Sequence, residues 1–185
     1  MFIQTEETPN PATLKFLPGR TILENGTANF ELGDDHNSSP LAKILFSIEG
    51  VVGVFFGSDF ITITKNNDVL WEHIKPALLG TIMEFLQSGK EITKEKNNEN
   101  AHASHEGPNG EIVKKITDLL DTRIRPAVAQ DGGDITFQSF QEGIVYLHMQ
   151  GACAGCPSST MTLKMGIENL LKHYVPEVLE VRPVA

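Results

Sequence analysis

Cysteine is scarce in this chain, because its 185 residues include only Cys153 and Cys156. Two thiols in a chain of this length do not make the disulfide framework of a small secreted domain. A reducing compartment fits this composition better. In such a compartment a C-x-x-C pair more often binds a metal or carries out redox chemistry than forms a structural disulfide.

Long apolar runs and basic patches are also missing. The longest apolar run, GVVGVFFG at residues 50–57, falls well short of the roughly 20 residues that a membrane-spanning helix needs. The formal net charge is −9, which argues against binding driven by nucleic-acid phosphates. Residues 1–11 resemble neither a secretion signal nor an Arg-rich transit peptide. The sequence therefore predicts no membrane or nucleic-acid partner and a cytoplasmic location, with an already processed organellar chain as the alternative.

A polar stretch divides the chain in two. Residues 88–110, SGKEITKEKNNENAHASHEGPNG, have Ile92 as their only large aliphatic residue. Such a composition cannot bury enough apolar area to offset the entropy of ordering the segment. We expect a first domain over residues 1–88, a flexible linker over 89–109 and a second domain over 110–185.

The first half has the pattern of a mixed α/β domain. Its expected elements are strands at 13–19 and 28–32 with a turn at Pro18-Gly19, a helix over 40–48 capped by Ser39, a hairpin of 51–56 with 60–65, and a helix over 69–87. Pro76 lies inside the last helical pattern, so we expect a kink or a restart there. The apolar residues 53–57 are expected to fill the core of the hairpin.

The second half predicts the order α-β-β-α-β. Its expected elements are a helix over 110–129 interrupted late by Pro126, a turn at QDGGD (130–134), strands at 135–140 and 144–149, a helix over 157–174, and a strand over 178–184. In the turn, the two glycines are expected to take positive φ and the two aspartates to hydrogen bond locally. The predicted fold class is α+β, with two small mixed α/β domains.

The C-x-x-C pair falls between the second hairpin and the helix that follows it. Pro157 marks the first helical position, so free N–H groups and the positive end of the helix dipole point at the thiols. Such a position is expected to lower the thiol pKa and to favour the thiolate. Gly151, Ala152, Ala154 and Gly155 are small, and we expect them to leave the site open.

The number of ligands limits the chemistry of this site. Structural zinc and iron–sulfur clusters typically take four ligands, and one chain supplies two cysteines, so a four-thiolate site requires two copies. His148 is predicted as a strand residue, and Met161 and Met165 are expected to fill the core. A dithiol–disulfide oxidoreductase is the alternative from another class, although a helix and a hairpin precede the pair and no aromatic residue flanks Cys153. A zinc-bridged dimer and an inert buried pair are further alternatives.

Several motifs together resemble a known family. IRPAVAQDGGDITF followed by GIVYLHMQGACAGCPSSTMTLKMGIENLL resembles the C-terminal domain of NifU, which Nfu-type iron–sulfur cluster carriers share. This likeness covers residues 111 to about 183. The segments TPNPATLKFLPGR, SPLAKILFSIEGVVGVFFGSDFITITK and WEHIKPALLGTIMEFLQSG resemble the Nfu N-terminal domain.

The resemblance implies a protein that holds a [4Fe–4S] cluster between the two protomers of a homodimer and delivers it to apo iron–sulfur client proteins. Carried over residue by residue, Cys153 and Cys156 are the metal and cofactor ligands. The resemblance also implies that the N-terminal domain contributes to client or partner recognition without cluster ligands, and residues 1–110 contain no cysteine. No acid–base pair, nucleophile or phosphate loop appears in the sequence, so no enzymatic turnover is predicted.

Overall fold

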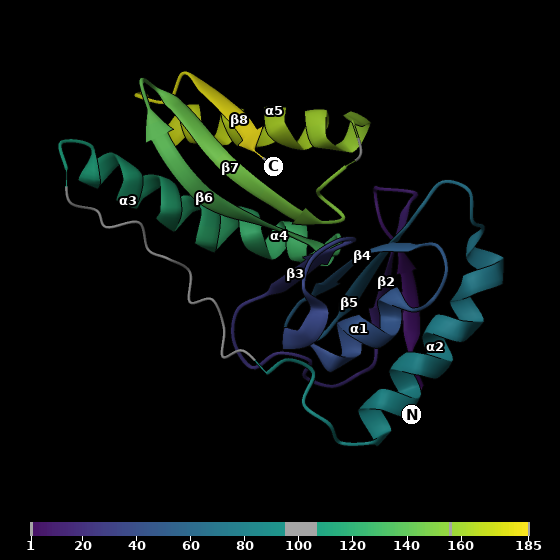
Figure 1. The fold of residues 1–185 in the computed structure, drawn as a ribbon. Helices are drawn as coiled ribbons and strands as arrows, with labels where there is room; N and C mark the ends of the chain where they lie inside the picture. The colour runs from purple at the N-terminus through teal and green to yellow at the C-terminus, as the bar shows by residue number, and fades with distance from the viewer. Residues whose placement is uncertain (1, 95–106, 156, 185) are drawn as a thin grey trace. The chain divides into compact units, whose positions relative to one another are not determined.

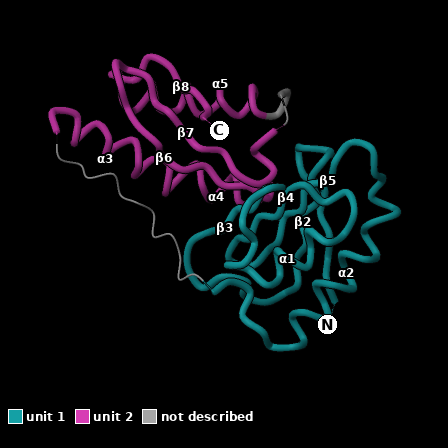
Figure 2. The backbone as a smooth tube through the Cα atoms, in the orientation of Figure 1, with its two compact units in different colours: residues 1–99 teal, residues 100–185 magenta. Residues whose placement is uncertain are grey.

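The computed structural model describes residues 2–94, 107–155 and 157–184, with the side chains of 157–159 left aside. The chain forms two compact units, residues 1–99 and 100–185, which Figure 2 shows in different colours. Each unit combines one sheet with helices, so the predicted α+β class is confirmed. Most of the predicted linker, residues 95–106, lies outside the described residues, and the linker and its boundaries stay a prediction.

The first unit is built on a five-stranded antiparallel sheet. Its elements are β1 (Gln4–Glu7), β2 (Thr13–Leu17), β3 (Ala28–Glu31), the short 3₁₀ helix η1 (His36–Ser38), α1 (Pro40–Phe46), β4 (Val51–Phe56), β5 (Ile61–Lys65) and α2 (Trp71–Gln87). The strand order is β1-β2-β5-β4-β3 (Figure 1). The predicted hairpin of β4 with β5 is confirmed, whereas β1 has no counterpart among the predicted strands. Although a turn follows β2, the strands β2 and β3 do not pair, since β5 and β4 separate them.

The two helices α1 and α2 pack on one face of this sheet. Side chains alternate along a strand, so every second residue points to that face. The strand residues there include Leu14, Phe16, Val54, Phe56, Ile61 and Ile63, and the helices add Leu41, Leu45, Leu78 and Ile82. All ten are less than a tenth exposed, and they include two residues of the apolar segment that the sequence assigned to the hairpin core.

Ser39 begins α1 and also fixes the segment that follows α2. Its hydroxyl oxygen accepts a hydrogen bond from the backbone N–H of Ala42 at 3.1 Å and donates one to the carbonyl of Ile92 at 2.6 Å. The backbone N–H of Lys94 donates to the carbonyl of Ser38 at 2.6 Å. Ile92 packs against the core of this unit, so contacts of the first unit continue beyond α2.

Pro76 does not divide α2. The helix runs as one element from Trp71 to Gln87 with Pro76 inside it, so the expected restart is wrong. Proline removes one backbone hydrogen bond of the helix. Burial of Leu78 and Ile82 farther along the helix outweighs that single loss.

The second unit has the predicted order α-β-β-α-β. Its elements are α3 (Gly110–Leu119), the π-helical segment η2 (Leu120–Ile124), α4 (Arg125–Gln130), β6 (Gly133–Gln141), β7 (Ile144–Gly151), α5 (Pro157–Tyr174) and β8 (Glu180–Val184). The strand order is β6-β7-β8, with β6 antiparallel and β8 parallel to β7 (Figure 1). Alternate strand residues and the helices form one core, which includes Ile116, Leu120, Ile135, Val145, Leu147, Leu171 and Val181.

The first helix of this unit passes Pro126 through a widened turn. The backbone N–H of Arg125 donates to the carbonyl of Leu120, five residues earlier, as in a π-helix. Proline has no N–H, and its ring would collide with a carbonyl of the preceding helical turn. The π-helical segment separates these groups, so the helical path reaches Gln130, and the regular α-helix is interrupted just before Pro126, close to where the sequence predicts it.

No helix in the described ranges has both the length and the apolar character needed to cross a membrane.

Candidate functional site

Cys153 lies in the turn between β7 and α5, where the sequence placed it. The backbone N–H of Ala152 donates to the carbonyl of Gly132 at 3.2 Å, and the hydroxyl of Thr160 donates to the carbonyl of Cys153 at 3.2 Å. The turn is thus tied both to the start of β6 and to the first turns of α5. Cys156, the other predicted ligand, lies outside the described residues.

Gly133 and Cys153 make the closest approach in this site. A β-carbon built on Gly133 would lie 2.5 Å from Cys153 Sγ and 2.8 Å from the carbonyl oxygen of Gln150. Real β-carbons essentially never come this close to another heavy atom, so no other residue fits at position 133 without moving its neighbours. Gly132 has φ +82° and meets the expected turn requirement, whereas Gly133 is needed for close packing. The turn explanation for Gly133 is therefore wrong.

The environment of Cys153 is less open and less favourable to a thiolate than the sequence predicts. Cys153 is 5% exposed and carries a free thiol. Burial raises the pKa of this thiol to about 12, and the nearby carboxylates of Asp131 and Asp134 add to the rise. Loss of hydration and two negative charges thus outweigh the helix dipole. The expectation of a lowered pKa in an open site is wrong for this cysteine.

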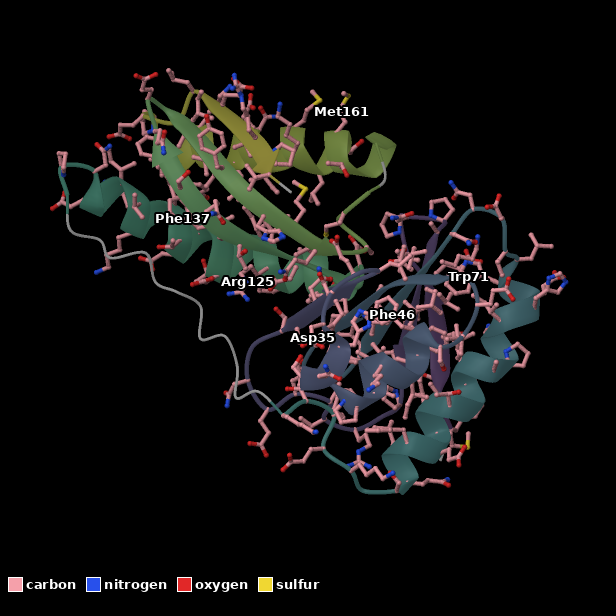
Figure 3. All side chains as sticks on the ribbon, in the orientation of Figure 1. Asp35, Phe46, Trp71, Arg125, Phe137 and Met161 are labelled. Carbon is pink, nitrogen blue, oxygen red and sulfur yellow. The ribbon has the colours of Figure 1, made fainter. Side chains whose placement is uncertain are left out.

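Asp134 is paired with Arg125. The two oxygens of the Asp134 carboxylate accept hydrogen bonds from Nε and Nη2 of Arg125, each at 2.9 Å. The Asp134 side chain is 5% exposed, so the pair is largely removed from water. Arg125 also donates to Asp121 at 3.1 Å, one helical turn earlier (Figure 3 labels Arg125). The local hydrogen bonding expected of Asp134 is also present, because its Oδ1 accepts from the backbone N–H of Ile135 at 2.9 Å.

Other residues near the site have clear positions. His148 lies within β7 opposite Thr136, as expected for a strand residue. Met161 and Met165 are 66% and 60% exposed, so their prediction as core residues is wrong. They fall on the side of α5 opposite Ile167, which is buried. Within the described residues, no group of three or more His, Cys, Asp or Glu side chains could hold a metal ion.

Arg125 was not predicted as a contributor to this site, and Thr160 and Gly133 were predicted near it without the contacts that they make. Arg125 is nine residues from Asp134, and an Arg before a Pro in a helical pattern gives no hint of a buried partner. Thr160 follows two serines in the first turns of α5, where several hydroxyl residues look equivalent. For Gly133 the signal was present as a glycine doublet, of which one member makes the turn and the other the close contact.

Both halves of the chain match known family models. Residues 3–89 match the model described as "Scaffold protein Nfu/NifU N terminal", and residues 116–182 match "NifU-like domain". The "NifU-like protein 5, mitochondrial" of Arabidopsis thaliana is 52% identical over 182 residues, which are 96% of this chain and 66% of that protein. The "NFU1 iron-sulfur cluster scaffold homolog, mitochondrial" of Homo sapiens is 50% identical over 185 residues, covering 100% of this chain and 72% of its own length.

A solved structure also aligns with part of the chain. The solution structure of a NifU-like protein from Saccharomyces cerevisiae covers 52% of this chain and 87% of its own, with 29% identity and a TM-score of 0.48.

The two matched models and the fold of each unit define a two-domain protein with an Nfu N-terminal domain and a NifU-like domain. The chain belongs to the Nfu/NifU family. It spans about two thirds of the length of the Arabidopsis relative.

Proposed function

We propose that this protein is a non-enzymatic scaffold and carrier that holds a [4Fe–4S] cluster between two copies of the chain and delivers it to apo iron–sulfur proteins. Cys153 and Cys156 of each copy supply the four thiolates. The observation that carries the proposal is the position of Cys153, at the turn between hairpin and helix of a NifU-like domain, in a chain with only two thiols. The Arabidopsis relative is called a NifU-like protein, and the human relative is called an iron–sulfur cluster scaffold homolog.

The surroundings of Cys153 fit a role as a cluster ligand whose bond to iron forms and breaks. In the free protein the thiol of Cys153 stays protonated, because its pKa is raised to about 12. Its sulfur also packs against Gly133. Iron must therefore displace a proton from this thiol when the cluster binds. This requirement weakens the hold on the cluster, which suits a protein that gives its cluster away.

Transfer then proceeds by thiolate exchange. A client cysteine gives up its proton and its thiolate binds iron, while the iron–sulfur bond to Cys153 or Cys156 breaks and that thiolate takes up a proton. No electron is gained or lost, so the exchange needs no oxidant or reductant. The first domain, which has no cysteine in residues 1–94, is proposed to contribute to recognition of clients.

The names of the relatives also bear on the compartment in which this protein works. Composition predicts the cytoplasm, with a processed organellar chain as the alternative. The mitochondrial names of both relatives support that alternative.

Anaerobic reconstitution with ferrous iron and sulfide tests the proposal. We expect a dimer with about four irons, and a monomer without iron after either Cys153→Ser or Cys156→Ser. Loaded protein mixed with an apo-protein that needs a [4Fe–4S] cluster should restore that protein's activity. A colourless monomer that cycles between dithiol and disulfide would instead favour the oxidoreductase. A dimer that retains zinc and no iron would favour the zinc-bridged form.

A further inference from the structure

We propose that Met161 and Met165 on α5 form the protein contact between the two copies that share the cluster. This inference rests on the proposed function and names the surface by which the second copy docks.

The two methionines form one continuous exposed patch. They are four residues apart, so they lie on the same side of the helix, and they are 66% and 60% exposed. Figure 3 shows Met161 pointing away from the sheet. Gly166 lies beside Met165, and a β-carbon there would meet no atom within 4 Å. The patch is therefore apolar, accessible and bordered by open space, and methionine side chains adapt readily to an opposing surface.

The position of the patch identifies its occupant as a second copy of this chain. The helix α5 begins at Pro157, directly after Cys156. Met161 lies about 6 Å along the helix from Pro157, and Met165 about 6 Å farther, at a rise of 1.5 Å per residue. A cluster held at the start of α5 brings the partner's own α5 to the same place. The partner then lies within reach of both methionines, which are about 6 and 12 Å along α5 from Pro157.

The distribution of charge favours the same occupant. Two copies with a formal net charge of −9 each repel one another over most of their surface. The first turn of α5 contains no acidic residue, and the first acid on this helix is Glu168. The only charged residue before it is Lys164, which lies 3.8 Å from Glu180 of the same chain. The methionine patch therefore occupies a part of an acidic molecule where two copies can approach at low electrostatic cost.

The size of the patch sets how strong this contact is. Stable interfaces bury about 1,200–2,000 Å² in total, far more than two methionines from each copy provide. The patch alone cannot hold two copies together, and the cluster alone leaves the apolar side chains in water. Dimerisation should therefore depend on the cluster and reverse when the cluster leaves.

Two matched double variants of the full chain separate apolar contact from other roles. M161Q/M165Q removes the apolar surface while keeping a similar length and good helix propensity, and M161L/M165L keeps the apolar surface. Each is loaded anaerobically with iron and sulfide, and the dimer is followed by mass in solution during dilution. We expect the Gln variant to dissociate at a concentration at least about tenfold higher than the unaltered protein, and the Leu variant within about threefold of it. Far-UV circular dichroism should be the same for all three.

The opposing outcomes are distinct. A Gln variant that keeps the same dimer dissociation as the unaltered protein overturns the inference and leaves the proposed function standing. A Gln variant that dimerises normally but transfers its cluster more slowly overturns it as well, because the patch then serves the client. An unaltered protein that takes up no iron and stays monomeric overturns the proposed function itself, and the inference with it.

Discussion

The guanidinium group of Arg125 and the carboxylate of Asp134 are joined by two parallel hydrogen bonds of 2.9 Å each. They connect the first residue of α4 to the second residue of β6. The pKa of Arg125 is raised, above all by its hydrogen bond to Asp134. Gly133, which packs against the sulfur of Cys153, immediately precedes the paired aspartate. The ion pair therefore holds the strand end on which the cysteine rests.

Removing the charge of Arg125 should destabilise the second unit strongly. Arg125→Gln leaves Asp134 buried without its counter-charge, and we expect a loss of about 3 kcal/mol in the free energy of unfolding. Asp134→Asn should reduce the free energy of unfolding by less, because Arg125 is 21% exposed and still pairs with Asp121. The double variant should cost less than the two single changes added together. Urea unfolding followed by far-UV circular dichroism measures all three.

An exposed ion pair supplies the control for that comparison. Arg182 pairs with Glu180 at 2.9 Å, with side chains 51% and 37% exposed. Arg182→Gln should leave the free energy of unfolding nearly unchanged, because both side chains of this pair are largely in water. If Arg125→Gln were no more harmful than this variant, the bidentate pair would not hold the site together.

Gly133→Ala should disturb the site through a single methyl group. Its β-carbon would come within 2.5 Å of Cys153 Sγ, so we expect a loss of about 1–3 kcal/mol in stability. Gly166→Ala is the matched control in the same unit, because it meets nothing within 4 Å and should stabilise α5 by about 0.5–1 kcal/mol. Unfolding curves of both variants test this. If Gly133→Ala were no more destabilising than Gly166→Ala, the close contact between Gly133 and Cys153 would be contradicted.

The reactivity of Cys153 should depend on pH in an unusual way. The thiolate reacts with iodoacetamide, and the pKa of Cys153 is raised to about 12. In a Cys156→Ser background, alkylation should be slow at pH 7 and should rise about tenfold per pH unit through pH 10, since the thiolate fraction rises in that way below the pKa. Unfolded protein should instead level off above pH 9. A folded protein that levels off above pH 9, as the unfolded protein does, would show that burial and the two aspartates do not govern this thiol.

Ser39→Ala should weaken the first unit alone. It removes the N-cap of α1 and the bond to the carbonyl of Ile92, at an expected cost of about 2 kcal/mol. Trp71 is the only tryptophan of the chain and lies in this unit, so its fluorescence reports the loss. Ser47→Ala, at an exposed serine just after α1, should cost less than about 0.5 kcal/mol. A similar loss in both variants would argue against the cap.

The order of elements in the second unit could be predicted because each has a strong local pattern. The strands β6 and β7 alternate, α5 has helical spacing, and its start is marked by Pro157. The order of strands in the first sheet was out of reach, because β1 has only four residues and pairs with β2 across a loop. The interruption near Pro126 could be predicted from the proline itself, whereas its form, a π-helical segment, could not, because helix propensity does not show how the backbone makes room for the ring.

The candidate site was predicted by type and not by environment. Residue spacing identified Cys153 and its place between a strand and a helix. It could not show that the turn folds back onto Gly133, which makes the sulfur buried, nor that Asp131 and Asp134 lie close enough to raise its pKa. Met161 and Met165 were assigned to the core because methionine readily fills gaps between packed side chains. Their positions lie off the apolar side of α5 that contains Ile167, and in the structure both are exposed.

The contact between Gly133 and Cys153 also has a genetic consequence. Every missense change in a glycine codon introduces a β-carbon, and at this position any β-carbon meets the sulfur. Amino-acid changes at Gly133 are therefore expected to disturb the turn that holds Cys153, although the glycine carries no reactive group.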